Sequence, residues 1–259
     1  MGIHEDEPDY RVPALQRGLS ILQMFNAEVR SLSSNAIAER LGVSVSAIYR
    51  ILITLTDMGY LRKLGKNSYE LGPQVLCDGF AYLASRDLVD IAMPHLNALR
   101  DRTSLSCHLS IREHTDSLYV GRAFAAQRLS VNIPIGTRIP CHCTAMGRML
   151  LCALTPMELD KLYQHVRLDD YPPPAPKTLP ELQQLIERDR ERGWVMHRSD
   201  YSTAIACAIR NHRGEVVAAI NLSGPEAVMD SPVARERYRE SLQQCADEIA
   251  AELGASPRR

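Results

Sequence analysis

Apolar positions near the N-terminus recur at helical spacing and predict consecutive helices. The first spans Ala14 to Asn26, where apolar residues four, three and three positions apart form one stripe toward a core: Leu15, Leu19, Leu22 and Phe25. Ile37 and Leu41 predict a short second helix that ends at Gly42. Three residues before it have side chains suited to capping its start: Ser33, Ser34 and Asn35.

A third helix is predicted after a cap at Ser44 or its neighbour, and its two faces differ. One face carries an apolar stripe that we expect to be buried: Val45, Ile48, Leu52, Leu55 and Met58. The opposite face begins with small polar residues, which let a helix approach base edges closely, and Arg50 can reach a phosphate or a guanine. We therefore expect four residues to face a DNA groove: Ser44, Ser46, Tyr49 and Arg50.

Two short strands are predicted next, at Tyr60–Leu64 and Ser68–Leu71, around a Gly-Lys-Asn turn typical of a hairpin. A helix, a turn, a second helix and a basic hairpin thus fit within about 40 residues. This pattern predicts a winged helix-turn-helix DNA-binding domain over residues 11–72. Lys63 and Lys66 on the hairpin are expected to contact DNA phosphates.

Helical and strand patterns alternate beyond residue 90 and predict an α+β body with an antiparallel sheet. We expect strands at Ser106–Arg112, Ser117–Phe124, Trp194–Arg198, Ala204–Arg210 and Glu215–Leu222. We expect helices at Met93–Asp101, Cys143–Ala153, Glu158–Val166, Leu179–Arg192 and Ser231–Leu253.

A connecting helix is predicted at Gln74–Ala84, with Leu76, Phe80 and Leu83 on one face. From the residues alone, this stripe could pack on the DNA-binding domain (the head), on the α+β body or on a second subunit.

The composition is that of an ordinary globular protein, and 259 residues suggest about two domains. The net charge is −1, yet residues 11–72 carry eight Lys or Arg against four Asp or Glu, a balance of +4 that suits attraction to phosphates. The seven cysteines, the acidic first ten residues and the absence of a long apolar run predict a reduced, cytoplasmic protein without a membrane segment.

Several of these segments resemble the IclR family of transcriptional regulators: Ala14–Leu22 is similar to its opening helix, Ile37–Ser44 and Tyr49–Leu52 to its second and third helices, and Tyr60-Leu61 with Tyr69–Gly72 to its wing. The resemblance covers roughly residues 12–254. It implies a linker helix over 73–90 that helps to pair two heads, and a GAF-like effector-binding domain over 91–254. It also implies a homodimer or a dimer of dimers on double-stranded operator DNA, a small-molecule effector, expected to be a carboxylic acid, and no cofactor.

The segment Ile135–Arg148 is similar to a motif of that domain, in which a loop leads into a helix. Because N–H groups at a helix start can bind an anion, the resemblance implies that Ala145 and Met146 line the effector pocket. Without the resemblance, Thr144 could simply cap a buried helix.

Asn221 and Ser223 stand two residues apart, so they share one face of the last predicted strand, and both can donate hydrogen bonds to an oxyanion. The sequence departs from the family just before this, because a shorter segment replaces the usual acidic residue and glycine-containing loop. Either His197 or Asp200 could occupy the acidic position. Cys207 is either pocket lining or a core thiol.

Other chemistry is weakly supported. Cys141-His142-Cys143 suggests a metal, but structural zinc normally takes four ligands from two separated pairs, and no second pair stands out. Adjacent cysteine and histidine rarely meet in a catalytic geometry, and hydrolase, metalloprotease and dinucleotide motifs are absent from the sequence, so we expect no catalytic residues. The alternatives are a winged domain that binds protein and, more weakly, a thiol-dependent enzyme in the C-terminal domain.

Overall fold

The structure is a computed structural model that describes residues 11–26, 28–84, 87–126, 132–199, 202–229 and 231–255. By its contacts the chain divides into two compact units, Met1–Ser85 and Arg86–Arg259. Each unit has a hydrophobic core of its own.

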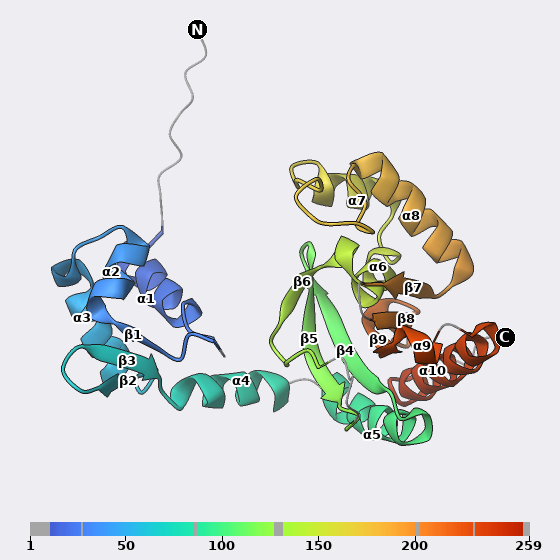
Figure 1. The fold of residues 1–259 in the computed structure, drawn as a ribbon, viewed down its shortest axis with the longest axis horizontal. Helices are drawn as coiled ribbons and strands as arrows, with labels where there is room; N and C mark the ends of the chain where they lie inside the picture. Colours follow the sequence, from blue (N-terminus) through green and yellow to red (C-terminus); the bar gives the residue numbers. More distant parts are fainter. Residues whose placement is uncertain are drawn as a thin grey trace, which may run out of the picture. The chain divides into compact units, whose positions relative to one another are not determined.

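Within its described residues, the first unit contains four helices and a three-stranded antiparallel sheet of order β1-β3-β2 (Figure 1). The elements are α1 (Pro13–Gln23), β1 (Ser31–Ser33), α2 (Ser34–Leu41), α3 (Val45–Asp57), β2 (Leu61–Leu64), β3 (Ser68–Leu71) and α4 (Gln74–Ala84). The predicted winged helix-turn-helix fold is confirmed. The sequence pattern missed β1, which pairs with β3.

α2 and α3 begin where the sequence predicted, whereas α1 ends at Gln23, before the predicted end at Asn26. The hydroxyl of Ser33 accepts a hydrogen bond from the N–H of Ala36 at 3.2 Å, and that of Ser44 accepts one from Ala47 at 3.3 Å. Gly42 ends α2 with a φ of 65°, in the left-handed region. These local signals set the sharp turn between α2 and α3.

The predicted stripe on α1 was partly wrong. Leu15 and Leu19 keep 61% and 53% of their surface exposed, whereas Ile21 and Phe25 are buried. Gly18 lies where α1 packs against α3, because a Cβ placed there would be 3.6 Å from a methyl carbon of Ile51 on α3. The packed face of α1 is therefore centred on Gly18 and Ile21. Met58, predicted to be buried, is 58% exposed because it caps the end of α3 beyond the last buried turn.

The start of α4 is fixed against the end of α3. The N–H of Gly72 donates to the carbonyl of Tyr60 at 2.8 Å, and Gln74 donates to the carbonyl of Gly59 at 3.2 Å. A side chain at Gly72 would meet the carbonyl oxygen of Gly59 at 2.1 Å, so only glycine fits there. Further along α4, Leu76 and Phe80 are 62% and 60% exposed, and the side chain of Leu83 lies outside the described residues.

The second unit is built on a six-stranded antiparallel sheet of order β6-β5-β4-β9-β8-β7 among its described residues. Its strands are β4 (Ser106–Glu113), β5 (Asp116–Ala123), β6 (Arg138–Pro140), β7 (Val195–Arg198), β8 (Ser202–Arg210) and β9 (Val216–Pro225). Its helices are α5 (Asp87–Thr103), the 3-10 turn η1 (Cys141–Cys143), α6 (Ala145–Leu151), α7 (Pro156–Tyr163), α8 (Leu179–Arg192), α9 (Glu226–Met229) and α10 (Pro232–Glu252).

The sheet lies between two helical layers (Figure 1). α5 and α10 pack on one face, and α6 packs on the other, flanked by α8. The predicted α+β class and antiparallel sheet are confirmed. The helix predicted at Cys143–Ala153 is shorter, because Thr144 caps α6 and η1 precedes it. The sequence pattern missed β6 and α9.

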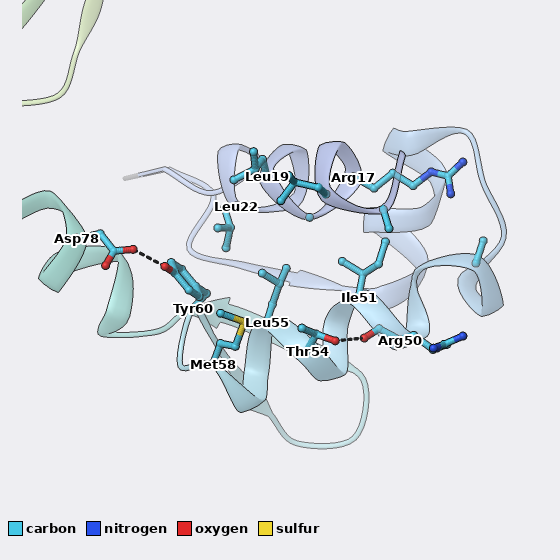
Figure 2. Close-up of a pocket in the computed structure, with 14 residues that line it drawn as sticks. Arg17, Leu19, Leu22, Arg50, Ile51, Thr54, Leu55, Met58, Tyr60 and Asp78 are labelled. Carbon is cyan, nitrogen blue, oxygen red and sulfur yellow. Dashed lines mark hydrogen bonds between the residues drawn. The ribbon is translucent and has the colours of Figure 1, made fainter. Parts of the chain in front are cut away.

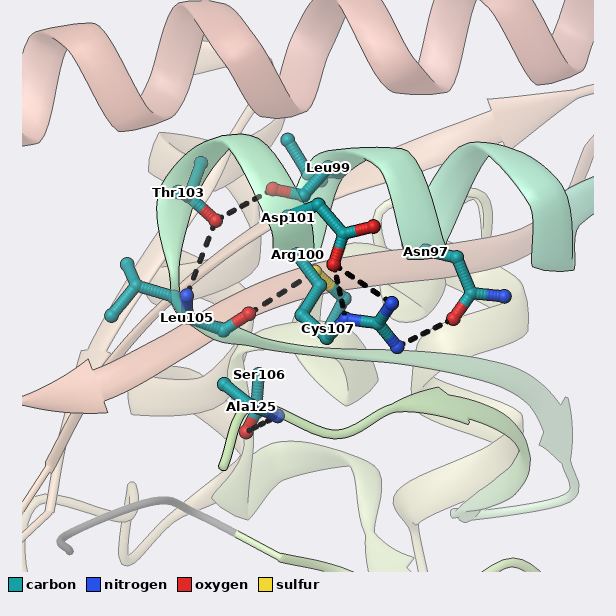
Figure 3. A network of polar contacts seen from close by, with 9 residues as sticks. All are labelled: Asn97, Leu99, Arg100, Asp101, Thr103, Leu105, Ser106, Cys107 and Ala125. Atoms are coloured by element: carbon teal, nitrogen blue, oxygen red, sulfur yellow. Dashed lines mark hydrogen bonds and ion pairs between the residues drawn. The ribbon is translucent and has the colours of Figure 1, made fainter. Parts of the chain in front are cut away.

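The junction between α5 and β4 is fixed by side-chain hydrogen bonds (Figure 3). The hydroxyl of Thr103 donates to the carbonyl of Leu99 at 2.7 Å and accepts from the N–H of Leu105 at 3.3 Å. Ser104 turns the chain with a φ of 56°. The hydroxyl of Ser106 then accepts from the N–H of Ala125 at 3.2 Å, which ties β4 to the end of β5.

A buried ion pair joins α6 to α8. Arg148 is 8% exposed and Asp189 1% exposed, and the guanidinium donates from Nε and from a terminal nitrogen, each at 2.8 Å, to the two carboxylate oxygens. Such a two-bond pair fixes both position and angle. It orients α6 on the sheet.

We predict that Asp189→Ala will lower the free energy of unfolding of the second unit by about 3–5 kcal/mol, because it leaves the buried charge of Arg148 unpaired. Urea denaturation monitored by circular dichroism measures this. The matched control is Glu236→Ala, which removes the partner of Arg239 on the surface of α10 and should lower the free energy of unfolding far less, because water screens an exposed ion pair. Equal losses in the two variants would contradict a structural role for the buried pair.

Candidate functional sites

The residues predicted to face a DNA groove lie on the solvent side of α3. Ser46, Tyr49 and Arg50 are exposed, and Tyr49 keeps 58% of its surface. Ser44 is exposed too, but its hydroxyl is already used as the cap of α3 and lies 2.9 Å from that of Ser46. The opposite face of α3 packs in the core through its apolar stripe, so the polar residues form one rigid, exposed surface.

The hairpin of β2 and β3 presents two exposed lysines, Lys63 on β2 and Lys66 in the turn. Arg62 is different, because its guanidinium forms an ion pair with Glu70 directly opposite on β3. The positive charge of the hairpin is therefore concentrated at the two lysines.

A groove lies between α1 and α3, with a volume of about 740 Å³ (Figure 2). Most of its lining is apolar and includes Leu19, Leu55 and Met58, while Arg17 and Arg50 stand at one end. At the other end the hydroxyl of Tyr60 donates to the carboxylate of Asp78 on α4. Leu19 and Met58, which the sequence placed in the core, are thus part of an open surface.

The sheet face that packs on α6, here called the inner face, carries polar residues in cross-strand rows. Directly paired residues project from the same face of a sheet. One row runs from β5 to β7: Arg122, His108, Asn221, Ala206 and Val195. The neighbouring row runs from β4 to β7: Ser106, Ser223, Ala204 and His197. Three of the predicted effector residues, Asn221, Ser223 and His197, are therefore brought onto one face.

Asn221 is held by its neighbour His108. Its side-chain oxygen accepts from the backbone N–H of His108 at 3.0 Å and lies 3.0 Å from Nδ1 of the same residue. His108 is 1% exposed, and burial lowers its pKa to about 4. The hydrogen bond to Asn221 opposes this shift, and the nearby charge of Arg122 adds to it. The imidazole is neutral at physiological pH. The hydroxyl of Ser223 donates to the carbonyl of Ser106 at 3.4 Å.

Ala145 and Met146 form the first turn of α6 and are buried against the inner face. Thr144 caps this helix, since its hydroxyl accepts from the N–H of Gly147 at 2.9 Å. A Cβ at Gly147 would lie 2.4 Å from the carbonyl oxygen of Cys141, so α6 rests directly on η1. α6 has seven residues, and this short length makes the dipole invoked from the sequence a minor contribution.

His197 occupies the end of β7 on the inner face and is half-buried. Burial lowers its pKa to about 4, and the charge of Arg148 acts in the same direction. It is therefore neutral and supplies no negative charge. Asp200, the other residue considered for the acidic position, lies outside the described residues.

His108, Ser106 and Arg122 were not predicted as site residues. Ser106, His108 and Ser110 alternate along a predicted strand, which is the same pattern that singled out Asn221 and Ser223. Such an alternation of polar residues ordinarily indicates the side of a strand that faces solvent. The structure buries this side instead.

Cys141, His142 and Cys143 form η1 beneath α6. Burial raises the pKa of Cys141 to about 12 and that of Cys143 to about 11, so both are protonated thiols rather than nucleophiles. His142 lies edge-on to Tyr163 and Tyr171, with ring centroids 5.8 and 4.6 Å away. Among the described residues, no three His, Cys, Asp or Glu are grouped as a metal would require.

Comparison with known proteins identifies the family. The model described as bacterial transcriptional regulator IclR C-terminal matches residues 80–251, and the model described as IclR helix-turn-helix domain matches residues 14–65. The chain belongs to the IclR family. The resemblance inferred from its sequence is confirmed, and this IclR-family protein is a DNA-binding transcriptional regulator.

Two curated relatives are regulatory proteins. The Pca regulon regulatory protein of Pseudomonas putida is 33% identical over 224 residues, which cover 84% of this chain and 75% of that protein. The HTH-type transcriptional repressor AllR of Salmonella typhi is 28% identical over 251 residues, which cover 94% of this chain and 91% of that protein.

Solved structures share the fold of the whole chain. A transcriptional regulator from Rhodococcus sp. RHA1 matches with a TM-score of 0.81 and 30% identity, over 94% of this chain and 99% of that one. An IclR homologue from Microbacterium hydrocarbonoxydans complexed with 4-hydroxybenzoate matches with a TM-score of 0.78 and 23% identity, over 94% and 100%. Within the described part of this IclR-family protein, no helix combines the length and apolar character needed to cross a bilayer.

We predict that the second unit loses stability as the pH falls from 7 to 5. The pKa of His108 is about 4 in the folded state and about 6.5 when unfolded, so the unfolded chain binds more protons in this window. One such histidine contributes a slope of at most about 1.4 kcal/mol per pH unit.

Urea denaturation across this pH range measures the slope. His108→Asn should make it shallower, whereas His212→Asn, at an exposed position in the β8–β9 loop, should leave it unchanged. An identical slope in wild type and His108→Asn would contradict the assignment of a neutral, buried imidazole.

Proposed function

We propose that this regulator binds a small organic acid on the inner face of its second unit and thereby changes the affinity of its first unit for operator DNA. The observation that carries this proposal is the burial of polar residues between the sheet and α6. Buried polar groups cost free energy unless they are paired, so an interior row of serine, asparagine and histidine favours a polar ligand. The named effector residues are Ala145, Met146, His197, Asp200, Asn221 and Ser223.

The DNA contacts follow from the exposed face of α3 and from the hairpin. Arg50 and Tyr49 would meet base edges or phosphates in the major groove, with Ser44 and Ser46 at the helix start. Lys63 and Lys66 would neutralise phosphates beside it. Both kinds of contact belong to the first unit, which leaves the second unit free to bind the effector.

We infer that the active form is a homodimer or a dimer of dimers. Leu76 and Phe80 on α4 are exposed large apolar side chains within the described chain, as are Leu15 and Leu19 on α1. A second copy of the chain would cover such a surface, and a two-fold dimer matches a palindromic operator. An effector changes this assembly only if it binds two arrangements with different affinity.

The acid class is supported by the relatives named above, since one acts on the Pca regulon and another was crystallised with 4-hydroxybenzoate. On this basis the regulator would control catabolic genes. It would act in the cytoplasm, without a cofactor and without catalysing a reaction.

We predict that Lys66→Ala weakens binding to specific and unrelated DNA alike, and lowers the slope of log affinity against log salt by about 1. A phosphate contact carries no sequence information, and its loss releases one counterion fewer. Gel-shift titrations at several salt concentrations measure the slope. Lys161→Ala, at an exposed position on α7, is the charge-matched control. An unchanged slope in Lys66→Ala would remove this lysine from the interface.

We predict that the double variant Asn221→Ala and Ser223→Ala abolishes the effector response and spares DNA binding. The readout is a gel shift with and without each acid of a thermal-shift screen that includes 4-hydroxybenzoate. The control pair, Ser241→Ala and Gln243→Ala at half-buried positions of α10, should respond as wild type does. Loss of DNA binding with a normal thermal shift would refute the division of labour between the two units.

A further inference from the structure

We propose that Arg122, His108 and Asn221 select an effector that carries both a carboxylate and a hydroxyl group, and that His108 recognises the hydroxyl. This inference rests on the function proposed above, in which an organic acid binds the inner face. It adds His108 and Arg122, which the sequence pattern did not single out, and it narrows the chemical class of the acid.

The three residues stand side by side on neighbouring strands. His108 on β4 is paired in register with Arg122 on β5 and with Asn221 on β9. All three side chains therefore leave the sheet on its inner face, with side-chain roots about 5 Å apart. The ring of Tyr119 stands edge-on to that of His108, with centroids 5.6 Å apart, and fixes the plane of the imidazole.

Hydrogen bonds define which nitrogen of His108 carries the proton. The backbone N–H of His108 is a donor, so the Asn221 atom 3.0 Å away from it must be the amide oxygen. That same oxygen lies 3.0 Å from Nδ1 of His108, which must then donate as well. Because the imidazole is neutral, Nε2 carries no proton and is a hydrogen-bond acceptor.

Within the described residues, the hydrogen bonds of this pair use Nδ1 of His108 and the side-chain oxygen of Asn221, and none is formed by Nε2 of His108 or by the amide NH₂ of Asn221. His108 is 1% exposed and Asn221 5% exposed, so bulk water does not satisfy them freely. Because Nδ1 faces Asn221, Nε2 points away from that residue across the imidazole ring. A ligand hydroxyl group can donate a hydrogen bond to Nε2.

Arg122 supplies the charge that completes the row. Its guanidinium donates to the side-chain oxygen of Asn132 at 2.6 Å, and its charge is felt by His108. Arginine binds a carboxylate through two parallel hydrogen bonds. The unprotonated Nε2 would in turn repel a carboxylate placed against it. The order across the sheet therefore assigns the carboxylate to Arg122 and the hydroxyl to Nε2 of His108, while Asn221 orients the imidazole.

Matched acids that differ by one hydroxyl test this assignment. Calorimetric titration of the full-length protein would use 4-hydroxybenzoate against benzoate, and malate against succinate. In at least one pair, we expect the hydroxylated acid to bind wild type about 10-fold more tightly than its partner, as one hydrogen bond to a buried group allows. His108→Phe should remove this preference, Arg122→Gln should weaken both acids of the pair, and the control His212→Phe should keep the wild-type pattern.

Acids that bind wild type without any preference for the hydroxyl would overturn this inference and leave the proposed function standing. If no acid of either pair binds, both the proposed acid effector and the proposed selection of a hydroxyl group are contradicted. A second measurement does not depend on a variant that folds. Nitrogen-15 spectra of histidine-labelled wild type at pH 7 should show His108 protonated at Nδ1 alone, and a proton at Nε2 would overturn the assignment.

Discussion

The packing of α6 against a sheet already covered on its other face is the constraint on which the second unit depends. α5 and α10 bury the outer face, so the central strands are buried on both sides. Any polar residue on the inner face must then find a partner in the interior, because water does not reach it. The Arg148–Asp189 pair holds α6 in place over that face, and Gly147 lets α6 rest directly on η1.

This arrangement gives the inner face the properties of a binding site. Small side chains, such as Ala206 and Ala219, alternate with polar ones, so strands that would otherwise form only core also carry hydrogen-bonding groups. The neutral state of His108 follows from the same burial, since a charge would be poorly solvated there. The burial of the inner face therefore determines both the selectivity for the effector and the stability of the second unit. A substitution there should change both.

The first unit has its core on one side of its DNA-binding helix instead of on both sides of a sheet. Its core is small and lies on one side of α3, which leaves the other side of the helix exposed and rigid. The exposed apolar residues of α1 and α4 do not stabilise this unit by themselves, and they are the part of its surface that a second copy can cover. α5 begins at Asp87, shortly after the end of α4, and packs on the outer face of the sheet.

The sequence by itself determined the local elements, because they depend on signals a few residues apart. The capped helix starts near Ser33 and Ser44, the stop at Gly42, the hairpin and the α+β body were all predicted from spacing and turn chemistry. The face shared by Asn221 and Ser223 was predicted from strand alternation alone. The order of the six strands, the exposure of Leu15 and Leu19, and the row of Arg122, His108 and Asn221 were decided only by the tertiary structure. Residues more than a hundred positions apart meet there through strand pairing, and no local periodicity records which strands pair or which side of each strand is covered.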